Sequence, residues 1–193
     1  DRACMVVDAH GEFATQRELP QLALVRPELG SDGVLLRAPG MEPLHVGMHQ
    51  GLEGVARRAK VWKDEVSAFD MGDAAAQWFS SYLSRHVDGR PVTSPKAYRL
   101  VRFDPNHKRL SSLTLTKGVE AANQFCDGYP LLVLSEAAMI DLNQRLTTAG
   151  HDAVGIERFR PNVVLADLES HDEDRVGVMT IDANGVQVQL LPV

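Results

Sequence analysis

Three polar side chains stand close together just before an apolar run near the C-terminal end of the chain. Arg158, Arg160 and Asn162 alternate along the segment RFRPN, and the run Val-Val-Leu follows directly. On an extended strand, residues two apart share one face, so these three side chains are expected to point the same way. Two guanidinium groups and an amide suit a ligand that combines a phosphate with a polar heterocycle. The alternative is an edge strand whose arginines are simply solvated.

Ser135 is the second residue whose type invites a chemical interpretation. It follows the apolar run at residues 131–134, which has the length of a buried strand, and it precedes a helical pattern in which Ala138, Leu142 and Leu146 fall four apart. No GxSxG elbow surrounds Ser135, and no His or Asp stands near it in sequence, which disfavours a serine nucleophile. We therefore predict that Ser135 is the N-cap of a helix.

The histidines do not form a pattern typical of metal ligands. His45 and His49 are four apart, but Gly47 and the surrounding β pattern argue against a helix face that could hold a metal ion. The acidic cluster at residues 171–174 is predicted to be a solvated turn, because a calcium loop needs a longer alternating set of ligands with a central glycine. We predict no metal ion bound by side chains of this chain.

The two cysteines, Cys4 and Cys126, each lie beside apolar, strand-like residues. We predict that both are buried, unpaired and inert thiols, which suits a reducing, cytoplasmic location better than a secreted disulfide scaffold.

Composition excludes some functional classes. A formal net charge of −6 disfavours general nucleic-acid binding, although a local basic pocket is compatible with it. Hydrophobic residues make up 44% of the sequence, and no apolar run approaches the roughly 18 residues of a membrane span. The 193 residues begin and end inside strand patterns, so we expect a piece of a longer protein.

The pattern of elements predicts an α+β fold dominated by antiparallel sheet. Short β runs (CMVVD, EFATQ, LALV, VLLRA and PLHVGM) suggest a meander or small barrel over the first 47 residues. A helix is predicted at residues 72–83 with Trp78 buried on its apolar face, and a strand at residues 98–103. Residues 86–95 are predicted to be an exposed connection and residues 104–123 a mobile loop bordering a site.

The last predicted element is a hairpin with strands at residues 176–181 and 186–190. Asn184 and Gly185 stand between them, and Asn-Gly is the strongest short hairpin signal. The predicted domains are 1–104, barrel-like and β-rich, and 105–193.

Several motifs in order resemble one family. The segments SEA, LNQRL and RFRPN after residue 130 resemble the MOSC domain, the molybdenum-cofactor sulfurase C-terminal fold. Upstream, DR with MVVD, TQRE, GDAAAQW and YRLVRF resemble the β-rich domain that precedes MOSC in larger members. The whole chain is similar to bacterial relatives of the mitochondrial amidoxime-reducing component. The resemblance implies a β-rich N-terminal domain followed by an incomplete MOSC β-barrel.

The resemblance also implies a molybdenum cofactor bound by Arg2, Gly128, Tyr129, Arg160 and Asn162. Arg2, Arg160 and Asn162 are expected to converge on one groove between the two domains, near the turn at residues 127–130. Arg17 could line the same basin or form a salt bridge with Glu18 or Glu12.

The family's molybdenum-ligating cysteine is expected beyond Val193, so no catalytic residue is assigned within the chain and the fragment alone is expected to be inactive. The parent protein would reduce small N-hydroxylated compounds with electrons from an iron-sulfur or haem partner. The alternative is a module that carries or senses the cofactor, or its sulfur, without catalysing reduction. A purely structural fragment is a third possibility.

Overall fold

The computed structural model describes residues 2–47, 49–85 and 96–192. The chain divides into two compact units. The N-terminal unit comprises Arg2–Arg109 and Ala122–Asp127, and the C-terminal unit comprises Leu110–Ala121 and Gly128–Val193. The predicted connection at residues 86–95 lies outside the described residues, and the domain boundary placed after residue 104 stays a prediction.

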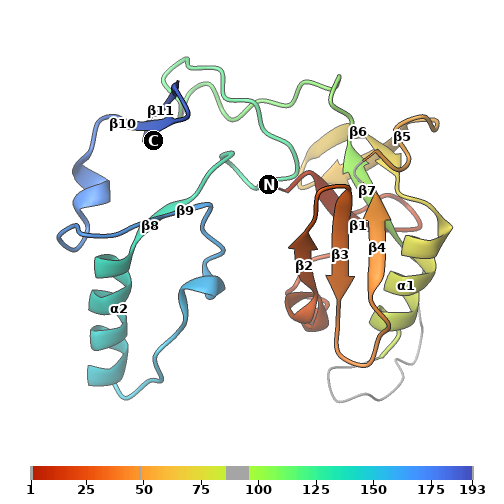
Figure 1. The fold of residues 1–193 in the computed structure, drawn as a ribbon, viewed down its shortest axis with the longest axis horizontal. Helices are drawn as coiled ribbons and strands as arrows, with labels where there is room; N and C mark the ends of the chain where they lie inside the picture. The colour runs from red at the N-terminus through yellow and green to blue at the C-terminus, as the bar shows by residue number, and fades with distance from the viewer. Residues whose placement is uncertain (1, 48, 86–95, 193) are drawn as a thin grey trace. The chain divides into compact units, whose positions relative to one another are not determined.

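Two antiparallel sheets make up most of the N-terminal unit (Figure 1). The four-stranded sheet has the order β1-β7-β6-β5, and the three-stranded sheet has the order β2-β3-β4. The strands of the first are β1 (Cys4–Asp8), β5 (Arg57–Val61), β6 (Asp64–Asp70) and β7 (Tyr98–Phe103). Those of the second are β2 (Arg26–Leu29), β3 (Gly33–Arg37) and β4 (Leu44–Gly47).

The four-stranded sheet carries apolar side chains on both faces because residues alternate along each strand. Along β7, Tyr98 and Leu100 join one buried cluster, and Val101 and Phe103 join another. Helix α1 (Asp73–Leu83) packs on the first of these clusters, together with residues of β3 and β4.

The prediction for α1 is confirmed. Trp78 is only 8% exposed, and its indole N–H donates to the carbonyl of Glu42 at 2.8 Å. The bounds, Asp73–Leu83, fall within the predicted segment. An apolar stripe at helical spacing thus places the tryptophan in the core.

The β runs of the first 47 residues are confirmed in part. CMVVD, VLLRA and PLHVGM correspond to β1, β3 and β4. The strand predicted at LALV is wrong. Most of that segment lies in a 3-10 helix, η1 (Pro20–Leu24), which begins at a proline whose ring fixes a helical φ. EFATQ forms isolated bridges at Glu12 and Phe13 but no strand.

The C-terminal unit combines one parallel and one antiparallel strand pair. Strands β8 (Val133–Ser135) and β9 (Val163–Leu165) pair in parallel, and helix α2 (Glu136–Thr148) lies in the connection between them. The unit also holds two 3-10 helices, η2 (Ile156–Arg158) and η3 (Asp172–Arg175), and the hairpin of β10 (Met179–Ala183) and β11 (Val186–Leu190). The fold as a whole is α+β and mainly antiparallel, as predicted.

The hairpin between β10 and β11 is confirmed. Asn184 and Gly185 both have positive φ, 53° and 78°, which is the requirement of a type I′ turn. The first strand is shifted toward the turn, since β10 starts three residues later and ends two residues later than predicted, at Met179 and Ala183.

Two strand predictions around the site segment are wrong. The apolar run at residues 131–134 is not buried throughout, since Leu131 and Leu132 are about two-fifths exposed and β8 starts only at Val133. Residues 158–162 are not a strand, because η2 ends at Arg158 and the backbone turns at Arg160 before β9 begins at Val163.

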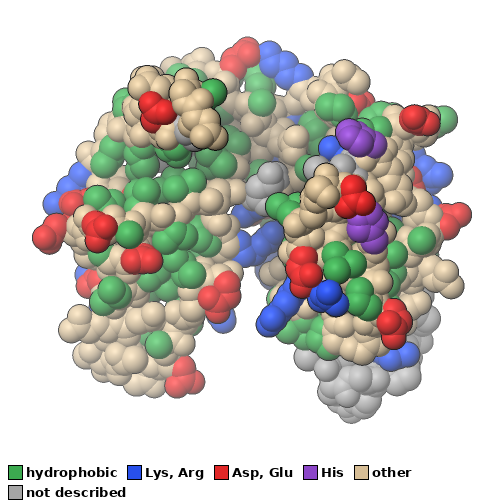
Figure 2. Space-filling view, viewed as in Figure 1, with side chains coloured by type: hydrophobic (Ala, Val, Ile, Leu, Met, Phe, Trp, Pro, Cys, Tyr) green, Lys and Arg blue, Asp and Glu red, His purple; other side chains and the backbone are tan. Residues whose placement is uncertain are grey.

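Large apolar side chains remain on the surface of the C-terminal unit. Figure 2 shows hydrophobic side chains gathered on the visible face of this unit, at the left of the view. The most exposed include Ile140, Val186 and Leu115. Both clusters of buried apolar residues found in the described parts of the chain belong instead to the N-terminal unit. Within the described residues, no helix has the length and apolar character needed to cross a bilayer.

Candidate functional site

Asn162 directly precedes β9 and is hydrogen-bonded to Leu132, which directly precedes β8. Its Oδ1 accepts a hydrogen bond from the N–H of Leu132 at 2.8 Å, and its own N–H donates to the Leu132 carbonyl at 2.8 Å. The side chain therefore continues the β8–β9 pairing by one residue. The side-chain oxygen of Asn162 thus serves the backbone of Leu132.

Arg160 occupies an uncommon backbone conformation. Its φ is +53°, in the left-handed region that few residues other than glycine adopt. The residue stands directly before Pro161, which disfavours a right-handed helical conformation at the preceding position. Arg160 therefore does not share a strand face with Arg158, which ends η2, and the predicted three-residue fork is wrong in its geometry. Both arginines are exposed.

The turn at residues 127–130 offers open space beside its glycine. A Cβ added at Gly128 would meet no other atom within 4 Å, so packing within the protein does not require a glycine there. Gly128, Tyr129, Arg160 and Asn162 all belong to the C-terminal unit, whereas Arg2 belongs to the N-terminal unit. The convergence of Arg2 with Arg160 and Asn162 stays a prediction.

Arg109 anchors the segment that leads into this turn, and sequence reasoning missed it. The side chain is 8% exposed, and its guanidinium donates to the Asp64 carboxylate at 2.8 Å. It also donates to the carbonyls of Gln124, Cys126 and Asp127 at 2.7, 2.8 and 3.2 Å. Arg109 lies in a polar stretch without periodicity, so no signal in the sequence marks it as buried.

The loop around Arg109 is held by more than one buried residue. Ser111, Thr116 and Asn123 are each less than a tenth exposed. The polar composition that suggested a mobile loop thus belongs, in part, to buried side chains.

Asp127 is held a second time, by its side chain. Trp62 donates from Nε1 to Asp127 Oδ1 at 2.9 Å, across 65 residues of sequence. Together, Trp62 and Arg109 fix the first residue of the turn through its carboxylate and its carbonyl. Position 127 is therefore well defined by contacts within the N-terminal unit, to which all three residues belong.

Ser135 caps helix α2, as predicted. Its Oγ accepts from the N–H of Ala138 at 3.0 Å and donates to Glu173 Oε1 at 2.8 Å. The backbone N–H of Ser135 also donates to that carboxylate oxygen, at 3.0 Å. With both functions of the hydroxyl engaged and the residue fully buried, Ser135 is structural.

Glu173 corrects the prediction of a solvated acidic turn. It is 8% exposed and lies in η3, facing the start of α2. Burial acts to raise the pKa of Glu173, but the hydrogen bonds from Ser135 and the nearby His171 outweigh it, so the pKa lies below its usual value. Within the described parts of the chain, no three His, Cys, Asp or Glu side chains gather as a metal site.

The two cysteines are not joined in a disulfide, as predicted, but only Cys126 is buried. Cys4 is exposed, so the prediction of two buried thiols is half wrong. It lies in β1, which pairs on one side with β7.

Comparison with known proteins shows which family this chain resembles. Residues 1–86 match the family described as the MOSC N-terminal beta barrel domain. The resemblance to MOSC proteins is confirmed. Mitochondrial amidoxime reducing component 2 of Rattus norvegicus is 33% identical over 180 residues, which cover 90% of this chain and 48% of that protein. The Bos taurus protein of the same name is 34% identical over 178 residues, with the same coverage.

A second kind of relative is also similar. Molybdenum cofactor sulfurase of Bos taurus is 25% identical over 203 residues, which cover 97% of this chain and 22% of that protein. The chain spans about half the length of the amidoxime-reducing relatives. Together, the matches associate this chain with molybdenum-cofactor proteins of the MOSC type.

Proposed function

We propose that this chain is part of a molybdenum-cofactor enzyme that reduces small N-hydroxylated compounds. The observation that carries the proposal is the similarity to amidoxime-reducing proteins over 90% of the chain, at 33–34% identity. Arg160 and Asn162 of the segment RFRPN are the polar side chains that we propose contact the cofactor.

The donor chemistry of the chain fits such a cofactor. Arg2 and Arg160 offer guanidinium groups suited to a phosphate, and Asn162 offers an amide suited to a pterin ring. Because a Cβ at position 128 would have no neighbour within 4 Å, a ligand has room to approach the backbone of Gly128 and Tyr129. In this proposal the five residues bind and orient the cofactor.

The cofactor, when bound, would supply the redox chemistry: two electrons and two protons convert an amidoxime into an amidine and water by cleavage of its N–O bond. Neither Cys4 nor Cys126 matches the family's metal-ligating cysteine, so the thiolate ligand is proposed to come from beyond Val193. An iron-sulfur or haem protein is the proposed electron donor, and a cytoplasmic location is proposed because the two cysteines form no disulfide with each other.

A direct test uses the full-length protein that contains this chain, purified from cells able to make the cofactor. We expect about one molybdenum per protein by metal analysis, and conversion of benzamidoxime to benzamidine when a reductant is supplied. Protein that carries molybdenum but leaves benzamidoxime unreduced would contradict the enzymatic proposal.

Bound molybdenum without reduction of benzamidoxime would favour the alternative function, a module that carries the cofactor or its sulfur. The similarity to molybdenum cofactor sulfurase over 97% of the chain is the observation in its favour. Transfer of the cofactor from the purified protein to a cofactor-free acceptor enzyme would then be the informative measurement.

A further inference from the structure

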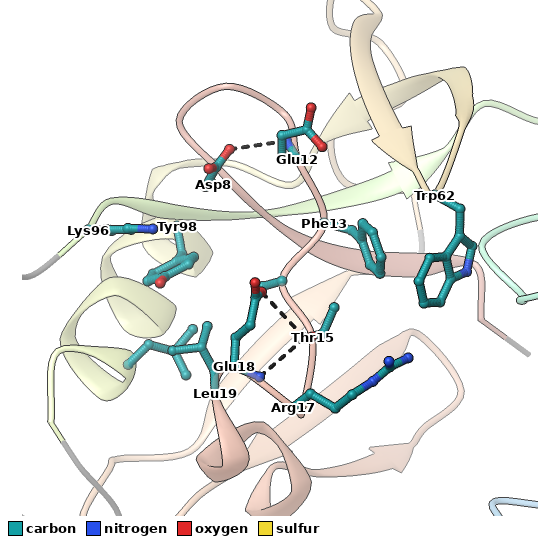
Figure 3. Close-up of a pocket in the computed structure, with 12 residues that line it drawn as sticks. Asp8, Glu12, Phe13, Thr15, Arg17, Glu18, Leu19, Trp62, Lys96 and Tyr98 are labelled. Atoms are coloured by element: carbon teal, nitrogen blue, oxygen red, sulfur yellow. Dashed lines mark hydrogen bonds between the residues drawn. The ribbon is translucent and has the colours of Figure 1, made fainter.

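A cavity of about 760 Å³ lies in the N-terminal unit, among residues that the proposed cofactor site does not use (Figure 3). Its lining comes from the segment after β1, from the β5–β6 turn, from the end of α1 and from the start of β7. The volume falls in the range typical of pockets for small organic ligands.

Two aromatic rings form one side of the cavity. The rings of Phe13 and Trp62 are 4.9 Å apart between centroids and inclined by 60°. Figure 3 shows them next to each other, with Lys96, Tyr98 and Asp8 on the opposite side. Trp62 is 42% exposed although its N–H is held by Asp127, so its ring is presented to solvent in a fixed orientation.

The guanidinium of Arg17 lies over the Trp62 ring, 5.5 Å from its centroid. Neither Glu18 nor Glu12 forms the salt bridge that the sequence suggests, and among the described residues no carboxylate lies within ion-pair distance of Arg17. Stacking on an aromatic face restrains a guanidinium while leaving the N–H groups on its edge available to an acid.

The carboxylates that line the cavity are engaged elsewhere. Glu12 pairs with Lys60 at 2.9 Å, and one oxygen of Asp8 accepts the N–H groups of His10 and Glu12 at 2.9 and 3.1 Å. Glu18 accepts a long hydrogen bond from the Thr15 hydroxyl at 3.4 Å. The cavity therefore presents a restrained cationic donor in Arg17, with Glu12 paired to a lysine and with Asp8 and Glu18 hydrogen-bonded to neutral groups.

We propose that this cavity binds a planar aromatic acid, with the ring against Phe13 and Trp62 and the acid group on the edge of the Arg17 guanidinium. The apolar ring surface and the charge-assisted hydrogen bonds are both required for binding. The site is independent of the proposed cofactor function, because it uses none of the five residues assigned to the cofactor.

The test is a titration of the purified chain with benzoate, followed by tryptophan fluorescence. Trp62 and Trp78 are the two tryptophans of the sequence, and Trp78 is buried, so a ligand in the cavity should change the emission of Trp62. We expect saturable binding of benzoate, and much weaker binding of both acetate, which lacks the ring, and benzyl alcohol, which lacks the acid.

Arg17→Gln should weaken benzoate binding about tenfold or more, the loss that removal of a charge-assisted hydrogen bond typically brings. Arg26→Gln, a matched change of an exposed arginine on β2, should leave it unchanged. Calorimetric titration of both variants would confirm that loss of the fluorescence change is loss of binding.

Three results would overturn the proposal: no saturable benzoate binding, equal affinity for benzyl alcohol, or an Arg17→Gln chain that binds benzoate as the wild type does. Preferential binding of benzamidine would show that the acidic groups, rather than Arg17, select the ligand. It would likewise overturn the proposal.

Discussion

Two polar side chains in this chain hold backbone segments in place through hydrogen bonds that the local sequence does not predict. Arg109 is the clearest case, since one buried guanidinium satisfies a carboxylate and three backbone carbonyls. Asn162 similarly uses its side-chain oxygen as a backbone acceptor. A buried polar group of this kind is costly to remove, because several partners lose their hydrogen-bond donor at once.

Arg109→Met should therefore destabilise the chain by about 2 kcal/mol or more, measured as the free energy of unfolding in urea. Asp64 and three carbonyls would lose their donor while the apolar volume changes little. Arg37→Met is the control, since Arg37 forms an exposed ion pair with Glu28 and should cost at most about 1 kcal/mol. Equal effects of the two changes would contradict the role given to Arg109.

The buried carboxylate of Glu173 should make stability depend on pH. Its pKa in the folded state lies below the ordinary value of 4.5, so its contribution is fully present above that pH. As the pH falls from 4.5 through the lower pKa that Glu173 has in the folded chain, this stabilisation is lost. The reason is that Glu173 is protonated at a higher pH in the unfolded chain than in the folded chain.

Glu173→Gln, which does not titrate, provides the comparison. Between pH 6 and pH 3.5 the wild type should lose more unfolding free energy than the variant, because all other carboxylates titrate in both proteins. If the unfolding free energies of the two proteins change in parallel with pH, the ionised Glu173 does not stabilise the fold through its hydrogen bonds from Ser135.

At the scale of elements, secondary structure could be predicted where the sequence has a regular local pattern and not where it lacks one. Helix α1 and the β10–β11 hairpin could be predicted because a helical stripe and an Asn-Gly turn are local signals. The segment around Arg160 could not, since alternating residue types suggest a strand while the left-handed Arg160 and the following proline interrupt it. The parallel pairing of β8 with β9 is a non-local contact that no local pattern specifies.

The confirmed helix allows a prediction about packing. Trp78→Ala should cost about 3–5 kcal/mol of unfolding free energy, because it leaves a cavity beneath α1 and an unpaired carbonyl at Glu42. Gln77→Ala, an exposed change at the adjacent position of the same helix, should stay within about 0.5 kcal/mol. A Trp78→Ala variant as stable as Gln77→Ala would contradict the assignment of α1 to the core.

At the scale of the whole molecule, an acidic chain is proposed to hold an anionic ligand. The net charge is −6, so positive charge has to be concentrated locally wherever a phosphate is bound. The family could be recognised from the order of several motifs, but the candidate site only in part. The resemblance points to Arg2, Arg160 and Asn162, whereas the supporting contacts of Arg109 and Trp62 depend on tertiary structure.

The most direct test of the proposed cofactor site is the molybdenum content of the full-length protein carrying Arg160→Ala, measured by metal analysis beside the wild type. Arg160 is exposed, so its removal should leave the unfolding midpoint nearly unchanged. We predict a loss of most of the bound molybdenum in Arg160→Ala, and wild-type content in the control Arg26→Ala. An Arg160→Ala protein that keeps its full molybdenum content would contradict the assignment of the cofactor site.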